Sequence, residues 1–197
     1  MIAVCGPDDL IAELEQYKNQ FHIISKDNAF ENRDEVLLYL FEDGHKIKFR
    51  SDQTILINAV TETLSANNLP PNIVRMNGWK SFISRTTWEI AGNINQNLSD
   101  ALIKIDKKIL QVKDEPGFIA GRVLAMIINE AWFTKEENIS SEKEIDIAMK
   151  LGTGYPYGPF EWTSIIGANH IVDLLHKLAA TDDRYMPCEL LKNAARS

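Results

Sequence analysis

The pattern of apolar residues changes partway along this chain, and the change limits what the chain can fold into. Before it, short apolar runs alternate with polar, glycine-containing or proline-containing segments; after it, apolar residues recur at helical spacing. Pro116 and Gly117 interrupt the chain close to the change, just before the apolar run 118–128, which suits a buried helix. The sequence therefore predicts two domains, an α/β domain over residues 1–112 and an all-helical domain over residues 113–197.

Most of the apolar runs in the first part are typical of β-strands. They are rich in Ile, Leu and Val, and turn-forming or polar residues separate them. The run 34–41 fits a strand and a helix equally well, whereas 99–105 has a helical pattern. Strands that alternate with short helices predict a parallel, layered α/β unit. The predicted strands are 2–5, 21–25, 54–57, 73–76, 86–90 and 108–112.

Helix-start and helix-stop signals organise the second part. Ser141 and Glu144 have the spacing of a capping box, and the helix that they begin is predicted to end at Gly152. Three glycines and two prolines within 152–159 predict a shaped turn, after which Pro159 opens another helix. Apolar residues around 171–178 and 190–194 predict two more helices.

Composition limits the class of protein and its partners. The net charge of -7 argues against a nucleic-acid binder, and no apolar run approaches the roughly 18–20 residues of a membrane span. The first residues lack the basic start of a signal peptide. Cys5 and Cys188 have no metal-ligand spacing, so we expect reduced thiols, no metal site and a cytoplasmic location.

Several short blocks follow one another from Asp114 to about Ala195. They read Asp114-x-Pro-Gly-Phe-Ile-x-x-Arg122, Asn129-Glu130-Ala131, Ile145-Asp146-x-Ala148-Met149-Lys150-Leu151-Gly152, Gly154-x-Pro156-x-Gly158-Pro159-Phe160-Glu161 and Ile166-Gly167. In this order they resemble the C-terminal helical domain of the 3-hydroxyacyl-CoA dehydrogenases. The resemblance implies that a Rossmann-like domain with a parallel sheet precedes the helical domain. In this chain that domain would be shortened, because residues 1–112 leave less room than the family uses.

The resemblance also implies a reaction and an assembly. Family members oxidise an L-3-hydroxyacyl-CoA with NAD, as in fatty-acid β-oxidation. A histidine takes the hydroxyl proton, a glutamate orients that histidine, and a serine and an asparagine hold the substrate oxygen. Imidazole suits this role because its pKa lies near neutral pH. The family dimerises through its helical domain, so the resemblance implies a homodimer.

The cofactor fingerprint of the family is incomplete in this chain. A Rossmann fingerprint reads G-x-G-x-x-G after the first strand, because glycines let the backbone approach the pyrophosphate. The corresponding residues are Gly6-Pro7-Asp8-Asp9-Leu10-Ile11, of which Gly6 alone matches. Asp8 and Asp9 would place negative charge beside the phosphates. We therefore expect no cofactor, and NAD only if this degenerate site still works.

The catalytic positions are incomplete as well. The family's His-x-x-Asn-Pro turn corresponds to residues 74–78, which keep Asn77 but have no histidine. Glu89 matches the orienting glutamate, and Thr61 lies where the substrate-oxygen hydroxyl is expected. Gly121 stands where the family has its asparagine, just before an arginine. The candidate catalytic residues are therefore Glu89, Asn77 and Thr61.

Three hypotheses of function follow from these matches. In the first, the chain is a non-catalytic or altered family member that keeps the scaffold and binds an acyl-CoA or a partner protein. In the second, it is an active NAD-dependent oxidoreductase on L-3-hydroxyacyl-CoA. In the third, the same cleft carries a different reaction. Binding of NADH and of acyl-CoA would separate these hypotheses.

Overall fold

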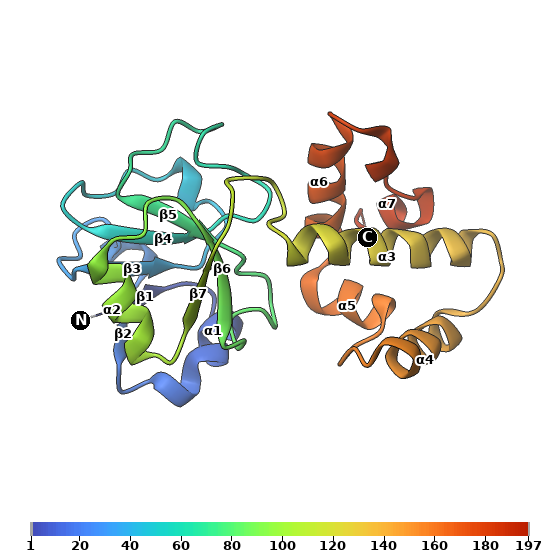
Figure 1. Ribbon diagram of the computed structural model, residues 1–197, viewed down its shortest axis with the longest axis horizontal. Coiled ribbons are helices and arrows are strands. Elements are labelled where there is room, and N and C mark those ends of the chain that lie inside the picture. Colours follow the sequence, from blue (N-terminus) through green and yellow to red (C-terminus); the bar gives the residue numbers. More distant parts are fainter. Residues whose placement is uncertain (1, 197) are drawn as a thin grey trace. The chain divides into compact units, whose positions relative to one another are not determined.

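The computed structural model describes residues 2–196 and divides the chain into two compact units (Figure 1). The first unit extends to Phe118 and the second begins at Ile119. Met1 and Ser197, the outer ends of the two predicted domains, lie outside the described residues. Within the described residues no helix is long and apolar enough to cross a membrane.

The first unit is built on a seven-stranded sheet with the order β2-β1-β3-β4-β5-β6-β7. All neighbouring strands are parallel except β5 and β6, which are antiparallel. The second unit is all-helical, so the predicted fold class, an α/β unit followed by an all-α unit, is confirmed. The strands are β1 (Ile2–Cys5), β2 (Phe21–Ile23), β3 (Val36–Tyr39), β4 (Thr54–Asn58), β5 (Ile73–Met76), β6 (Thr87–Ala91) and β7 (Lys108–Gln111).

The ambiguous run 34–41 forms strand β3, because both faces of the sheet are covered. All four residues of β3 are buried, which gives the continuous apolar run of a central parallel strand instead of an alternating one. Leu38 joins the core on one face, and Leu37 and Tyr39 join the core on the other.

The two faces of the sheet are covered differently. Helices α1 (Asp8–Ile11) and α2 (Gln96–Lys104) contribute to the core on one face. On the other face, loops between the strands supply apolar side chains such as Phe49 and Leu69. Among the described residues, the connections from β3 to β4 and from β4 to β5 contain no α-helix.

The chain reverses its direction of travel across the sheet at β1. It moves outward from β1 to β2 and then crosses back to β3, which pairs with the other edge of β1. In open α/β sheets, ligands bind at the carboxyl ends of strands beside such a switch point. In this unit that position lies between Gly6, after β1, and Leu40, after β3.

The second unit packs around α3 (Ala120–Glu136), which contacts α5 (Pro159–Ile166), α6 (Ala168–Ala179) and α7 (Glu189–Ala194). Helix α4 (Glu142–Thr153) begins with the predicted Ser141–Glu144 capping box. The prediction that Gly152 ends this helix is wrong. Gly152 is helical, and Gly154 follows the helix with the left-handed φ of 70° that a C-terminal cap requires.

Candidate functional site

The turn after β1 is closely packed on one side and acidic at the start of the next helix. A Cβ atom built on Gly6 would lie 2.5 Å from the Cβ of Leu40, so the two strand ends are already in close contact. The following helix α1 has only four residues, and Asp8 and Asp9 lie in its first turn. A pyrophosphate needs free amides at a helix N-terminus and an approach to the backbone through glycine. Around Gly6, the side that faces Leu40 is filled, and two acidic residues stand where the family fingerprint has none.

The acidic residues after β1 bind the chain itself. The Asp9 carboxylate lies 3.0 Å from the Lys80 ammonium, and Glu13 accepts hydrogen bonds from the backbone amides of Ser81 and Ser84, the latter at 2.9 Å. These contacts fasten the loop between β5 and β6 to the first connection of the sheet. The carboxylates of Asp9 and Glu13 therefore hold this loop in place.

The structure brings two of the three predicted catalytic residues together. Asn77 directly follows β5 and Glu89 lies in the neighbouring strand β6, and their side chains are 4% and 9% exposed. The Asn77 Nδ2 donates to Glu89 Oε2 at 3.4 Å, while Asn77 Oδ1 accepts from the backbone amide of Trp79 at 3.4 Å. Both ends of the amide are thus engaged. An amide cannot take up a proton near neutral pH, so Asn77 cannot act as the base that an imidazole would supply.

Thr61 and Gly121 are not part of this pair. Thr61 lies partly buried in the loop after β4, and among the described residues no hydrogen bond joins it to Asn77 or Glu89. Gly121 is buried in the first turn of α3 and has no side chain to offer a substrate oxygen. Within residues 2–196, no group of three or more His, Cys, Asp and Glu side chains could hold a metal ion.

Sequence reasoning missed Asn58, which joins three strand ends. Its Nδ2 donates to the carbonyl oxygen of Leu40 after β3, and its Oδ1 accepts from the amide of Gly78 after β5, each at 3.1 Å. A Cβ on Gly78 would lie 2.6 Å from Asn58 Oδ1, so the glycine allows this contact. The signal in the sequence was a polar residue at the end of an apolar strand, where a polar side chain needs a buried partner.

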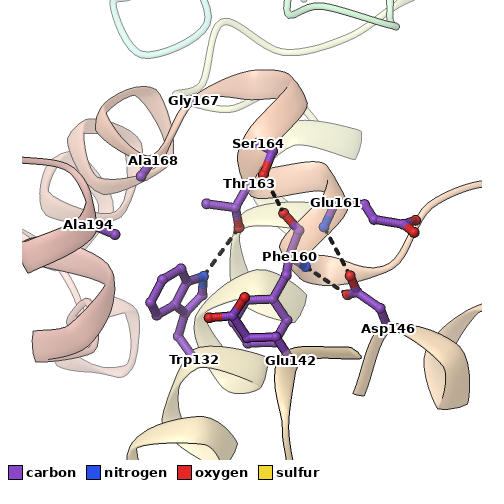
Figure 2. Close-up of a pocket in the computed structure, with 10 residues that line it drawn as sticks. All are labelled: Trp132, Glu142, Asp146, Phe160, Glu161, Thr163, Ser164, Gly167, Ala168 and Ala194. Carbon is purple, nitrogen blue, oxygen red and sulfur yellow. Dashed lines mark hydrogen bonds between the residues drawn. The ribbon is translucent and has the colours of Figure 1, made fainter. Parts of the chain in front are cut away.

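In the helical unit, the turn between α4 and α5 is held by carboxylates (Figure 2). Asp146 accepts from the amides of Phe160 at 2.8 Å and Glu161 at 3.2 Å, which satisfies the first turn of α5. Glu161 accepts from the amide of Gly158 at 2.9 Å and pairs with Lys150 at 2.5 Å. The Lys150 hydrogen bond lowers the pKa of Glu161. The family block from Gly154 to Glu161 therefore has a structural role here.

A cavity of about 560 Å³ lies beside this turn (Figure 2). The Trp132 indole donates to Thr163 Oγ1 at 3.2 Å on its wall, and the Lys135 ammonium lies 4.9 Å from the Trp132 ring centroid. Three of its lining residues are acidic, and two of these are paired with lysines, Glu142 with Lys135 and Glu161 with Lys150. The lining residues are Trp132, Glu142, Asp146, Phe160, Glu161, Thr163, Ser164, Gly167, Ala168 and Ala194.

Comparisons with known proteins agree with the architecture. A family model described as 3-hydroxyacyl-CoA dehydrogenase, C-terminal domain, matches residues 117–197. The 3-hydroxyadipyl-CoA dehydrogenase of Escherichia coli (strain K12) is 44% identical over 91 residues, which cover 45% of this chain and 19% of that protein. A probable 3-hydroxybutyryl-CoA dehydrogenase of Bacillus subtilis (strain 168) is 29% identical over 147 residues, covering 70% and 51%. This chain thus spans about half or less of these relatives.

A solved structure extends the similarity to both units. The crystal structure of (S)-3-hydroxybutyryl-CoA dehydrogenase from Ralstonia eutropha superposes with a TM-score of 0.72, covering 98% of this chain and 92% of that one. The two sequences are 16% identical, so this likeness concerns the fold alone.

Proposed function

The chain belongs to the 3-hydroxyacyl-CoA dehydrogenase family through its helical unit, and from this premise we propose that it binds an acyl-CoA without transferring hydride. The observation that carries the proposal is the close contact between Gly6 and Leu40 at the switch point. Together with Asp8 and Asp9 in the first turn of α1, it opposes binding of a dinucleotide. Without a bound nicotinamide there is no hydride acceptor.

The residues around Glu89 support the same proposal. In the family reaction a glutamate orients an imidazole, whereas here Glu89 accepts a hydrogen bond from the Asn77 amide. Loss of a general base typically costs on the order of 10²–10⁴-fold in rate. Asn77 and Glu89 could still position a ligand oxygen, which is a binding role.

The class of ligand is taken from the relatives. The two curated relatives described above carry names of enzymes that act on 3-hydroxyacyl thioesters of coenzyme A. We therefore propose that this chain binds a thioester of the same class but does not transfer hydride to or from it. The alternative, an active NAD-dependent oxidoreductase of the fatty-acid β-oxidation type, would require NAD to bind beside Gly6 despite Asp8 and Asp9 in the first turn of α1.

Calorimetric titration of the full chain separates the two. We expect saturable binding of acetoacetyl-CoA, a higher melting temperature in its presence, and no heat of binding for NADH. A mixture of both ligands should show no oxidation of NADH above the protein-free rate. Saturable micromolar binding of NADH, with reduction of acetoacetyl-CoA, would establish the alternative instead. Free coenzyme A is the control that distinguishes recognition of the acyl group from recognition of the nucleotide.

A role in association is a second candidate, and one feature of α4 favours it. Leu151 is 83% exposed and Ile147, one helical turn earlier, is 44% exposed, so this helix presents an apolar strip. We propose that the strip contributes to a homodimer. Sedimentation of Leu151→Glu tests this, because the charge should shift a dimer towards monomer.

A cytoplasmic location completes the proposal, supported by the two free, buried cysteines.

A further inference from the structure

Arg75 is a buried cation in the middle of an apolar strand. It lies in β5 and is 0% exposed, and its guanidinium donates in several directions. The Nε donates to Asp114 Oδ1 at 2.6 Å, Nη1 to the carbonyl oxygen of Ala59 at 2.9 Å, and Nη2 to that of Glu115 at 2.5 Å. A planar fork of donors suits this set of acceptors, whereas a lysine could satisfy fewer of them.

Asp114 is the centre of a second set of hydrogen bonds. Besides Arg75, its carboxylate accepts from the backbone amides of Leu64 at 3.1 Å and Ser65 at 3.0 Å. Burial alone would raise the pKa of Asp114, but the amides of Ser65 and Leu64 and the Arg75 guanidinium together lower it. The carboxylate therefore joins β5, the loop after β4 and the segment that follows β7.

The segment held by this pair has an unfavourable backbone. Gly117 and Phe118 have φ angles of 80° and 52°. Glycine adopts this region readily, but an aromatic residue does so only when its surroundings impose it. Here the Phe118 ring is 4% exposed and lies 4.1 Å from the Arg75 Cζ, and the Gly117 amide donates to the Val60 carbonyl at 2.8 Å. The same guanidinium thus contacts both ends of the segment.

We propose that Arg75 and Asp114 form a latch that holds residues 114–118 in this strained turn, and that the turn opens as a local unit when the latch is broken. The sheet does not depend on the latch, because its strands are held by their own ladders and by two separate apolar cores. Besides the hydrogen bond from Gly117 to Val60, the segment is held by the Arg75 contacts with Asp114, Glu115 and the Phe118 ring, so this ion pair is central to its order. The latch is independent of any ligand that the protein binds.

Amide hydrogen exchange of the full chain tests the latch. Asp114→Asn removes the charge and one acceptor oxygen, and loss of a charge-assisted hydrogen bond weakens a structure by a factor of about 10–100. We expect exchange of the amides in 114–118, and of Leu64 and Ser65, to accelerate at least about tenfold. The amides of β1 and β3 should exchange as in the unaltered protein.

Two further variants separate the latch from a general loss of stability. Glu115→Gln changes the neighbouring, exposed carboxylate and should leave exchange in 114–118 unchanged. Arg75→Lys keeps the charge but not the fork, and should accelerate the same amides as Asp114→Asn. The proposal is overturned if Asp114→Asn leaves 114–118 protected, or if β1 and β3 accelerate by the same factor as 114–118. If Arg75→Lys does not fold, Asp114→Asn and Glu115→Gln still decide between these outcomes.

Discussion

Replacement of Gly158 by alanine should destabilise the helical unit. A methyl group there would lie 2.3 Å from Oδ1 and 2.5 Å from Cα of Asp146. Because the Cα belongs to the backbone of α4, no change of rotamer relieves the contact. Overpacking of this kind costs about 1–3 kcal/mol. Displacement of Asp146 also removes the acceptor for the Phe160 and Glu161 amides, and a lost N-terminal cap costs about 1 kcal/mol.

The expected fall in the free energy of unfolding is therefore about 2–4 kcal/mol. For a domain of the size of the helical unit, each kcal/mol of this fall lowers the melting temperature by roughly 4–8 °C. Urea and thermal unfolding of the full chain, followed by circular dichroism and tryptophan fluorescence, would measure it. Hydrogen exchange in α4 and α5 would show that the loss is in the helical unit.

Two neighbouring glycines supply the matched controls. A Cβ on Gly152 meets nothing within 4 Å, and this residue is helical, so Gly152→Ala should stabilise by about 0.5–1 kcal/mol. A Cβ on Gly154 also meets nothing within 4 Å, but this residue has a φ of 70°. Gly154→Ala should therefore destabilise the protein by about 1–2 kcal/mol through backbone strain alone. The reasoning is refuted if Gly158→Ala costs no more than Gly154→Ala, because contact with Asp146 would then contribute nothing.

Three other predictions concern buried polar groups. Folding lowers the pKa of Asp114, so its carboxylate stabilises the protein at pH values above the pKa of the unfolded state. This stabilisation is lost as the pH falls through the pKa of the folded state. The free energy of unfolding of Asp114→Asn should therefore depend less on pH in this acidic range than that of the unaltered protein. Asn129→Leu should cost about 2–4 kcal/mol in urea unfolding, because it leaves the Met186 carbonyl and the Cys188 amide without partners. Burial raises the pKa of the Cys5 thiol to about 11, so a disulfide reagent should modify Cys5 at neutral pH only after unfolding.

Six of the seven strands were predictable from the sequence because their apolar residues are short, contiguous runs between turn residues, whereas the run that forms β3 fitted a strand and a helix equally well. The predicted parallel arrangement does not hold for β5 and β6, which are antiparallel, although the connection between them carried a signal. A parallel crossover needs a dozen or more residues and usually a helix. Residues 77–86 contain no α-helix, and they return the chain beside β5 in the antiparallel direction.

The candidate site was less predictable than the strands, because it depends on contacts between distant residues. Asn77 and Glu89 were identified through the family resemblance, and their separation of 3.4 Å places them in one hydrogen bond. Nothing in the local pattern predicted that Asn58 would join three strand ends or that Arg75 would reach Asp114. Such partners become apparent only once the order of the strands is known.

The residues that carry the family resemblance in the helical unit have scaffold roles in this structure. Asp146 and Glu161 hold the first turn of α5, Gly158 makes room for Asp146, and Asn129 ties the segment before α7 to α3. A chain that needs these contacts to fold keeps such residues whether or not it catalyses a reaction. The blocks therefore identify the fold, and activity has to be judged at Gly6, Asn77 and Glu89. The close approach of Leu40 to Gly6 and the two acidic residues of α1 weigh against a pyrophosphate, and Glu89 bonds to an amide in place of an imidazole. Binding without hydride transfer is therefore the function we propose.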